Sequence, residues 1–162
     1  MRNLLASPLR HEQIDAAWAL IRICGNVRGS LAEWRAYAKS RLPSASRAPG
    51  RQGLVAIHCT RGYIYGLFAY DAETDPVHRM VLTVEPLAFA RLAHSLDPGE
   101  VLLAASEDLA RALDCRAIHL VLSADDEDGS GLRRIGRDCG YRLTAERLCK
   151  ELPDTKAGKP VN

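Results

Sequence analysis

The sequence predicts a single α/β (α+β) domain with a mixed, mostly antiparallel sheet and helices on both faces. Three observations predict this fold class. Two amphipathic helical stretches open the chain, two strand-like runs joined by a short turn follow, and residues 79–122 read as strand, helix and strand. A strand–helix–strand unit joins its two strands by a right-handed crossover, so at least one pair of strands in the sheet should be parallel. The 162 residues suffice for one domain with a substantial core.

The two helices are marked by apolar periodicity. Residues 11–23 place apolar side chains at helical spacing, and a second helix starts at Ser30, where Glu33 completes the spacing of a capping box. Its apolar stripe should face the core together with Trp18 of the first helix. A loop rich in Pro, Ser and Gly is expected at 43–53.

Three strands should follow. The runs 53–60 and 63–71, separated by Arg61-Gly62, are typical of a hairpin. A further apolar run, 78–86, should end at its proline because a central strand cannot contain one.

The second half of the chain continues the alternation of helices and strands. Its expected elements are a long helix at 101–115, a buried parallel strand at 117–123, a short helix at 131–139 and a final pair of strands at 141–145 and 147–152. The domain should therefore span 1–152, and the tail 153–162 should be disordered because it has nothing to pack against the domain.

Composition and charge are those of an ordinary soluble protein. Hydrophobic residues make up 47% of the chain and charged residues 26%, and the net charge is only +2, with basic residues scattered. Arg10, Glu12 and Asp15 interrupt the first apolar stretch before it reaches the length of a signal peptide, and no run approaches a membrane span. We expect a cytoplasmic protein that binds neither nucleic acid nor membranes.

The five cysteines and five histidines form no metal-binding pattern. The cysteines are odd in number and widely spaced, without a CxxC pair, which favours small buried side chains in a reducing compartment. No HxH or HxxxH pair occurs. The acidic stretch ADDEDGSG at 124–131 lacks the spacing of calcium ligands in an EF-hand, and acids there are typical of a solvated lead-in to a helix. We expect no metal site.

Four local patterns, together with the element order, resemble the GNAT N-acetyltransferase superfamily. They are the strand ending VLTVEP, the long helix ending in Asp114-Cys115, the strand AIHLVL and the pair Gly140-Tyr141, where the family has Gly-Phe. The resemblance covers the chain except its tail. It implies the GNAT fold, an acyl-CoA donor (acetyl-CoA) and an amine acceptor that is a small molecule or a peptide. The exposed aromatic residues of the hairpin and the final strands would allow a homodimer.

The resemblance also implies a cofactor site. In the family, a turn of the form Q/R-x-x-G-x-G/A opens the long helix, and its backbone N–H groups hold the pyrophosphate of acetyl-CoA. Counting back from Cys115 puts this turn on 94–99, with only Gly99 matching and Asp97 in place of the first glycine. The implied cofactor contacts are Leu82, Thr83 and Val84 on the strand, and His94, Ser95, Leu96, Asp97, Gly99 and Val101 around the turn.

The same turn also reads as a well-capped helix start. Asp97 is a natural N-cap, Pro98 suits the first helical position, and Glu100 completes a D-x-x-E spacing. Pro98 lacks an N–H, and a carboxylate about 4 Å from a phosphate costs up to about 4 kcal/mol per pair of unit charges near a surface. Both a phosphate cradle and a self-capped helix therefore remain open for the turn.

For catalysis, the resemblance implies Glu85 as the general base. It ends the strand run, and alternation places Val81, Thr83 and Glu85 on one face. An exposed strand-end charge is the alternative for Glu85. The position at which the family has a Tyr as general acid is Gly136 in this chain. Tyr141 should be a core aromatic residue.

Two functions from different classes follow. The first is an N-acetyltransferase that transfers an acyl group from acetyl-CoA, or another acyl-CoA, to an unidentified amine. The second is a catalytically silent GNAT-fold module for binding or dimerisation that has lost or weakened CoA binding. A sensor of another ligand in the same cleft is a variant of the second.

Overall fold

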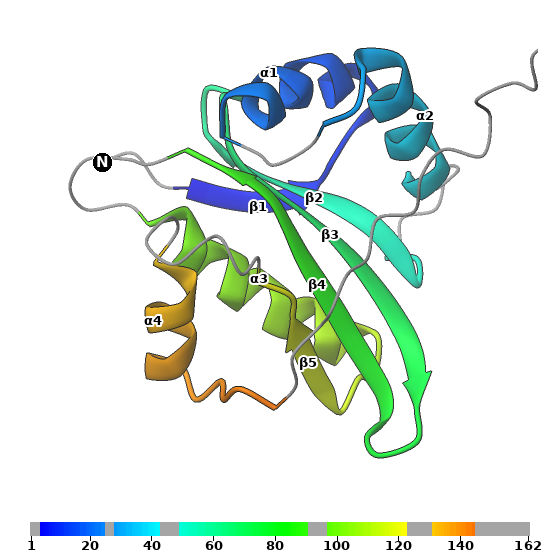
Figure 1. Ribbon diagram of the computed structural model, residues 1–162, viewed down its shortest axis with the longest axis vertical. Coiled ribbons are helices and arrows are strands. Elements are labelled where there is room, and N and C mark those ends of the chain that lie inside the picture. The colour runs from blue at the N-terminus through cyan, green and yellow to red at the C-terminus, as the bar shows by residue number, and fades with distance from the viewer. Residues whose placement is uncertain (1–3, 25–27, 43–48, 91–96, 123–130, 145–162) are drawn as a thin grey trace, which may run out of the picture.

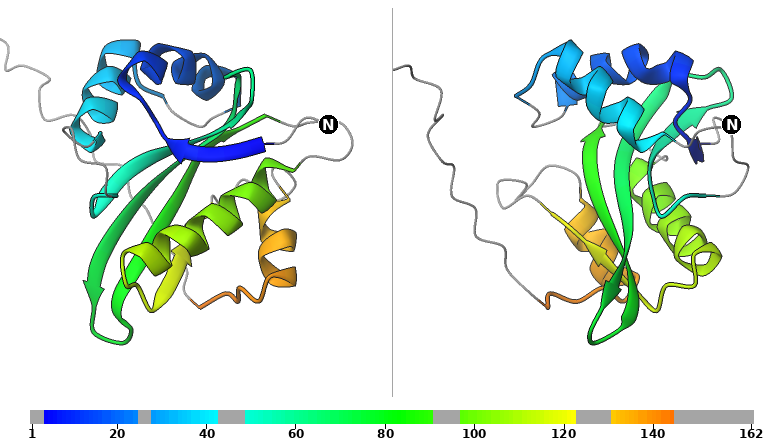
Figure 2. Two further views of the ribbon diagram at one scale, coloured as in Figure 1. Left: turned by 180° about the vertical axis from the view of Figure 1, so that it is seen from behind. Right: turned by 90° about the vertical axis from the view of Figure 1, so that its right-hand side faces the viewer.

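The computed structural model describes residues 4–24, 28–42, 49–90, 97–122 and 131–144. These form a five-stranded sheet in the order β1-β2-β3-β4-β5. Helices α1 and α2 cover one face, and α3 and α4 cover the other (Figures 1 and 2). The elements are β1 (Leu4–Pro8), a short 3-10 turn (His11–Gln13), α1 (Ile14–Cys24), α2 (Leu31–Arg41), β2 (Gln52–Cys59), β3 (Ile64–Asp75), β4 (Arg79–Phe89), α3 (Pro98–Ala112), β5 (Ala117–Leu120) and α4 (Leu132–Asp138).

The mixed, mostly antiparallel sheet is confirmed. The pairs β1–β2, β2–β3 and β3–β4 are antiparallel, and β4–β5 is parallel. Strand β1 is an addition to the prediction: Leu4–Pro8 pairs along β2 from Cys59 to Val55. Strand β1 was not predicted, because a stretch of five residues carries too little periodicity.

Each face of the sheet has its own apolar core. On the α1/α2 side, Ile21, Trp34 and Ala38 pack with Leu54 and Ala69 of the sheet, along with other buried residues. The capping box of Ser30 and Glu33 that starts α2 is present, with the Ser30 N–H donating to Glu33 Oε2 at 2.6 Å. The predicted second helix is thereby confirmed.

The opposite core lies between the sheet and α3/α4. Leu102, Leu103, Leu132 and Ile135 pack there with Phe68 and other sheet residues. Full burial of a leucine such as Leu102 contributes about 1.5–3 kcal/mol, so this row of contacts fixes both helices to the sheet.

The expectation that the third strand ends at its proline is wrong. Strand β4 runs through Pro86 to Phe89. Its register against β3 skips Leu87, with Phe68 opposite Pro86 and Leu67 opposite Ala88, so a β-bulge accommodates the extra residue. On its other side β5 does not extend to Pro86, and the missing N–H therefore removes no ladder hydrogen bond there.

Three other expectations at the end of the chain need correction or fall outside the structure. Strand β5 is parallel as predicted but not buried: it ends at Leu120, and His119 is exposed. Strand β5 is mostly half-buried because it forms the edge of the described sheet. Residues 141–144 adopt no regular structure, whereas 145–152 and the tail lie outside the described residues. None of the described helices is long and apolar enough to cross a membrane.

Candidate active site where β4 and β5 part

The most distinctive feature of the sheet is the point at which β4 and β5 separate. Strand β5 pairs with β4 only over Val81–Val84, and the last bond is from the Val121 N–H to the Val84 carbonyl at 2.9 Å. Strand β4 continues for five residues, Glu85–Phe89, without a described strand beside it on that side. Its backbone there presents polar groups that an extended ligand can pair with.

Glu85 stands at this fork. Its side chain is exposed, and its neighbour across β3 is Ala69, which belongs to the core under α1 and α2. Glu85 therefore projects toward the α1/α2 side. Because Thr83 lies opposite Asp71 and Val81 opposite Glu73, the predicted common face of Val81, Thr83 and Glu85 is confirmed.

A cluster of side chains from α2 and β3 shares this face. Arg41 Nη1 lies 2.9 Å from Asp71 Oδ2 and 3.2 Å from the Tyr70 carbonyl, and its guanidinium lies 5.0 Å from the centre of the Tyr37 ring. Burial raises the pKa of the Tyr37 phenol, Arg41 lowers it, and the charges of Glu85 and Asp71 raise it. Tyr37 is thus within electrostatic reach of Glu85.

Asp71 and Glu85 differ in charge balance. Asp71 is neutralised by the half-buried Arg41, whereas no Lys or Arg of the described residues forms an ion pair with Glu85. Sequence reasoning missed Tyr37 and Arg41, because the way α2 docks on β3 depends on tertiary packing.

The start of α3 is self-capped. Asp97 Oδ1 accepts a hydrogen bond from the Gly99 N–H at 2.8 Å, and Pro98 occupies the first helical position without an N–H. The bond goes to Gly99 rather than to Glu100, so the predicted D-x-x-E capping geometry is wrong although Asp97 is the cap. Of the first four helix positions, Pro98 thus has no N–H and the Gly99 N–H is occupied, and Glu100 adds a second carboxylate nearby.

Gly99 itself is explained by packing. It is buried, and a Cβ on it would lie 2.9 Å from Leu132 Cδ2 and 3.3 Å from Ile135 Cδ1 of α4. A larger residue at this position would force the Leu132 side chain of α4 to shift. At this turn, the residues that the structure describes do not fit a pyrophosphate.

The other residues that the family resemblance predicts as cofactor contacts lie in different surroundings. Leu82 and Val84 are fully buried under α3, while Thr83 and Val101 are half-buried. The backbone of 82–84 is paired with β5, so the free edge begins one residue later, at Glu85. His94, Ser95 and Leu96 lie outside the described residues.

The position of the family's acid holds no acidic side chain. Gly136 is buried in α4, with Tyr141 packed above it. The Tyr141 hydroxyl is buried without a hydrogen-bond partner among the described residues, and burial raises the pKa of Tyr141 to about 12, with a smaller contribution from the charge of Glu107. Tyr141 is therefore a core aromatic, as predicted.

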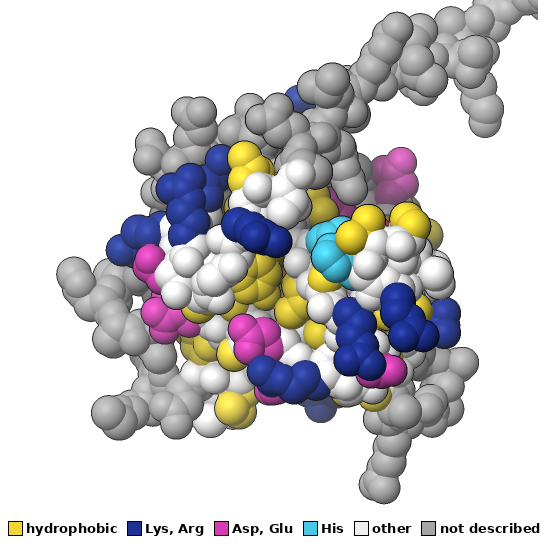
Figure 3. Space-filling view, turned by 90° about the horizontal axis from the view of Figure 1, so that it is seen from below, with side chains coloured by type: hydrophobic (Ala, Val, Ile, Leu, Met, Phe, Trp, Pro, Cys, Tyr) yellow, Lys and Arg dark blue, Asp and Glu magenta, His cyan; other side chains and the backbone are white. Residues whose placement is uncertain are grey.

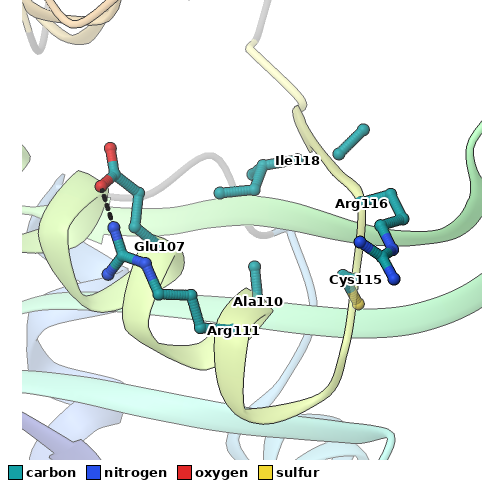
Figure 4. Close-up of a pocket in the computed structure, with 7 residues that line it drawn as sticks. Glu107, Ala110, Arg111, Cys115, Arg116 and Ile118 are labelled. Atoms are coloured by element: carbon teal, nitrogen blue, oxygen red, sulfur yellow. Dashed lines mark hydrogen bonds and ion pairs between the residues drawn. The ribbon is translucent and has the colours of Figure 1, made fainter.

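A shallow pocket of about 190 Å³ lies elsewhere, between the end of α3 and the start of β5 (Figure 4). Glu107 and Arg111, which line it, pair with each other at 3.0 Å, so their charges are internally balanced. Seen from below, apolar side chains surface in a hollow between two groups of Lys and Arg side chains (Figure 3). The pocket borders Ala117 and Ile118, which pair with Val81 and Leu82, so it lies beside the paired part of β4 and β5 rather than at the fork.

No group of three or more His, Cys, Asp or Glu within the described ranges is placed to hold a metal.

Several solved structures share the fold of this chain. A transcriptional regulator from Bacillus halodurans C-125 matches with a TM-score of 0.74 at 12% identity, covering 93% of this chain and 100% of its own. An aminoglycoside N-acetyltransferase in complex with CoA matches with a TM-score of 0.72 at 12% identity, covering 95% and 97% of the two chains. A ribosomal-protein-alanine N-acetyltransferase from Brucella melitensis biovar Abortus 2308 matches with a TM-score of 0.66 at 13% identity, covering 93% and 100%.

The chain has the fold of the GNAT N-acetyltransferases. No family model and no curated protein sequence matches it. The GNAT fold is therefore evident in this chain from structure alone. The fork between β4 and β5 and the exposed Glu85 are the features of this fold that bear on a chemical function.

Proposed function

We propose that this chain is an N-acyltransferase that moves an acyl group from acetyl-CoA, or another acyl-CoA, to an amine at the fork between β4 and β5. The observation that carries the proposal is the exposed Glu85, which has no ion-pair partner among the described residues, beside a length of β4 backbone with no described strand on its outer side. In this arrangement a carboxylate lies next to a stretch of strand backbone that no described strand pairs with on its outer side.

Glu85 has the chemistry of a general base. An amine that forms a bond to a thioester carbonyl carbon must lose a proton, while the carbon–sulfur bond breaks and the thiolate leaves. A carboxylate within reach of the amine, directly or through one water, accepts that proton. Because Gly136 offers no acid, the thiolate takes its proton from water, and positioning supplies the rest of the rate.

The acceptor should approach from the α1/α2 side, because Glu85 projects to that side. A cationic amine is favoured there, since Glu85 has no neutralising partner among the described residues. One structural neighbour is an aminoglycoside acetyltransferase and another is a ribosomal-protein-alanine acetyltransferase by their titles. A small-molecule or peptide amine is accordingly the proposed acceptor. The scattered charge and the free cysteines of the described residues support a reducing, cytoplasmic setting.

The test is acyl transfer by Glu85→Gln. With a panel of polyamine, aminoglycoside and peptide amines and acetyl-CoA, the wild type should release CoA. Loss of a general base should lower kcat/KM by about 100-fold or more, with a smaller loss at high pH, where the amine is already deprotonated. Glu73→Gln is the matched control, because Glu73 is an exposed carboxylate on the same face of the sheet and lies along β3 away from the fork. Equal rates for wild type and Glu85→Gln would refute the assignment of Glu85.

The self-capped start of α3 favours a second candidate, a GNAT-fold module without catalysis. Asp97 at the expected anion site disfavours tight CoA binding. A homodimer is part of this candidate, and exposed apolar residues such as Tyr63 and Leu5 would contribute to its interface. This candidate predicts no rise in melting temperature with millimolar acetyl-CoA, whereas a site at 100 times Kd adds about 2.7 kcal/mol to stability.

A further inference from the structure

We infer that the start of α3 from Asp97 onward gives an acyl-CoA donor no affinity through its pyrophosphate. The inference rests on the proposed function and specifies which part of the donor the protein reads. It follows from two regions of the structure that offer opposite chemistry: the free edge of β4 and the closed start of α3.

The start of α3 carries negative charge where a pyrophosphate would need donors. The Asp97 carboxylate lies 2.8 Å from the Gly99 nitrogen and already accepts its hydrogen bond. Pro98 contributes no donor, and Glu100 places another carboxylate in the same turn. An arriving phosphate would have to displace Asp97 and would then face two like charges.

The same turn is also closed sterically. Pro98 and Gly99 are both buried, and the space beside the Gly99 Cα is filled by Leu132 and Ile135 of α4. The turn cannot open toward a phosphate without separating α3 from α4, because Leu132 and Ile135 belong to the core that holds both helices on the sheet.

The edge of β4 differs from this turn, although Pro86 there also has no N–H to donate. It is polar, extended and without a described partner strand on its outer side from Glu85 to Phe89. The amide groups of a pantetheine arm are the kind of ligand that such an edge pairs with, because they alternate donors and acceptors along an extended chain. Recognition of the arm therefore does not depend on the α3 turn.

Calorimetric titration with CoA and with pantetheine tests the inference, because the two ligands share the arm and differ in the phosphates. The expected dissociation constants agree within about threefold, since the pyrophosphate gains nothing at the turn. CoA binding that is about 30-fold tighter or more than pantetheine binding would overturn the inference and leave the proposed acyltransfer standing. Failure of both ligands to bind would overturn the inference and the proposed function together.

A charge-removing variant gives a second readout. Asp97→Asn keeps an oxygen that can cap the Gly99 N–H but removes the charge, so it should tighten CoA binding several-fold and leave pantetheine binding unchanged. Asp108→Asn removes an exposed charge at the far end of α3 and should change neither. Weaker CoA binding by Asp97→Asn, with an unchanged melting temperature, would mean that Asp97 assists the phosphates and would contradict the inference.

Discussion

At the scale of single residues, surroundings decide what similar side chains do. Asp97 and Glu85 are both carboxylates at positions where the proposed function places a ligand. Asp97 is used internally, because its oxygen caps the Gly99 N–H. Glu85 is exposed and faces an opening without an ion-pair partner among the described residues. The cap on α3 was predictable from local spacing, and the face of Glu85 from strand alternation. The pairing of Arg41 with Asp71 was not, because it joins residues from separate elements.

Tyr141 gives a prediction at this scale that concerns stability. Its hydroxyl is buried without a partner among the described residues, and such an unsatisfied group costs about 1–3 kcal/mol. Tyr141→Phe should therefore raise the free energy of unfolding slightly or leave it unchanged at pH 7, as measured by chemical denaturation. A loss above about 1 kcal/mol would show that the hydroxyl has a partner.

The raised pKa of Tyr141 also sets the direction of a pH effect. Burial raises it to about 12, against about 10 in the unfolded chain, so the native state holds this proton more tightly. The contribution is fully present below pH ~10 and is lost as the pH rises toward ~12. Tyr141→Phe should lose less stability over this window than the wild type, whereas Tyr63→Phe, which alters an exposed ring, should behave like the wild type.

At the scale of elements, the contact between α3 and α4 depends on one missing side chain. A methyl group on Gly99 would lie 2.9 Å from Leu132 Cδ2 and 3.0 Å from Asp97 Oδ1. Gly99→Ala should therefore lower the free energy of unfolding by about 1–3 kcal/mol through overpacking, despite the better helix propensity of alanine. Denaturation midpoints at constant m-value would measure this change.

Gly136→Ala is the control for that prediction. Its added Cβ would meet Tyr141 Cβ at 3.6 Å, which is an ordinary contact, and its backbone is helical. It should be neutral or stabilise the protein by up to about 1 kcal/mol. If both variants behaved alike, the close approach of α4 to α3 would not be what requires Gly99.

The elements also show which signals in the sequence were sufficient. The order of elements from α1 to α4, the β2–β3 hairpin and the parallel β4–β5 pair were predictable from periodicity and turn residues, whereas β1 was not. The end of β4 was not. Pro86 is a poor residue for a central strand, but the bulge at Leu87 and the absence of β5 beside it make the position tolerable. That tolerance depends on the neighbouring strands, which no local pattern records.

At the scale of the whole molecule, fold and site have diverged to different degrees. The five-stranded sheet and its helices superpose on acetyltransferases at 10–13% identity, for example an aminoglycoside 6'-N-acetyltransferase from Acinetobacter baumannii with a TM-score of 0.69. The cores on both faces of the sheet explain the persistence of the fold, because binary patterning and volume suffice to maintain it. At the start of α3, Asp97 stands where the family motif has a glycine, and it caps the Gly99 N–H.

A donor that binds along β4 is expected to leave the start of α3 untouched. Amide hydrogen exchange followed by NMR, with and without saturating CoA, tests it most directly. Exchange should become slower at one or more amides of Leu87–Phe89, because they gain hydrogen bonds to the ligand, and should not change at Gly99–Val101, which lie in the self-capped turn. Protection confined to Gly99–Val101, with Leu87–Phe89 unchanged, would contradict the account.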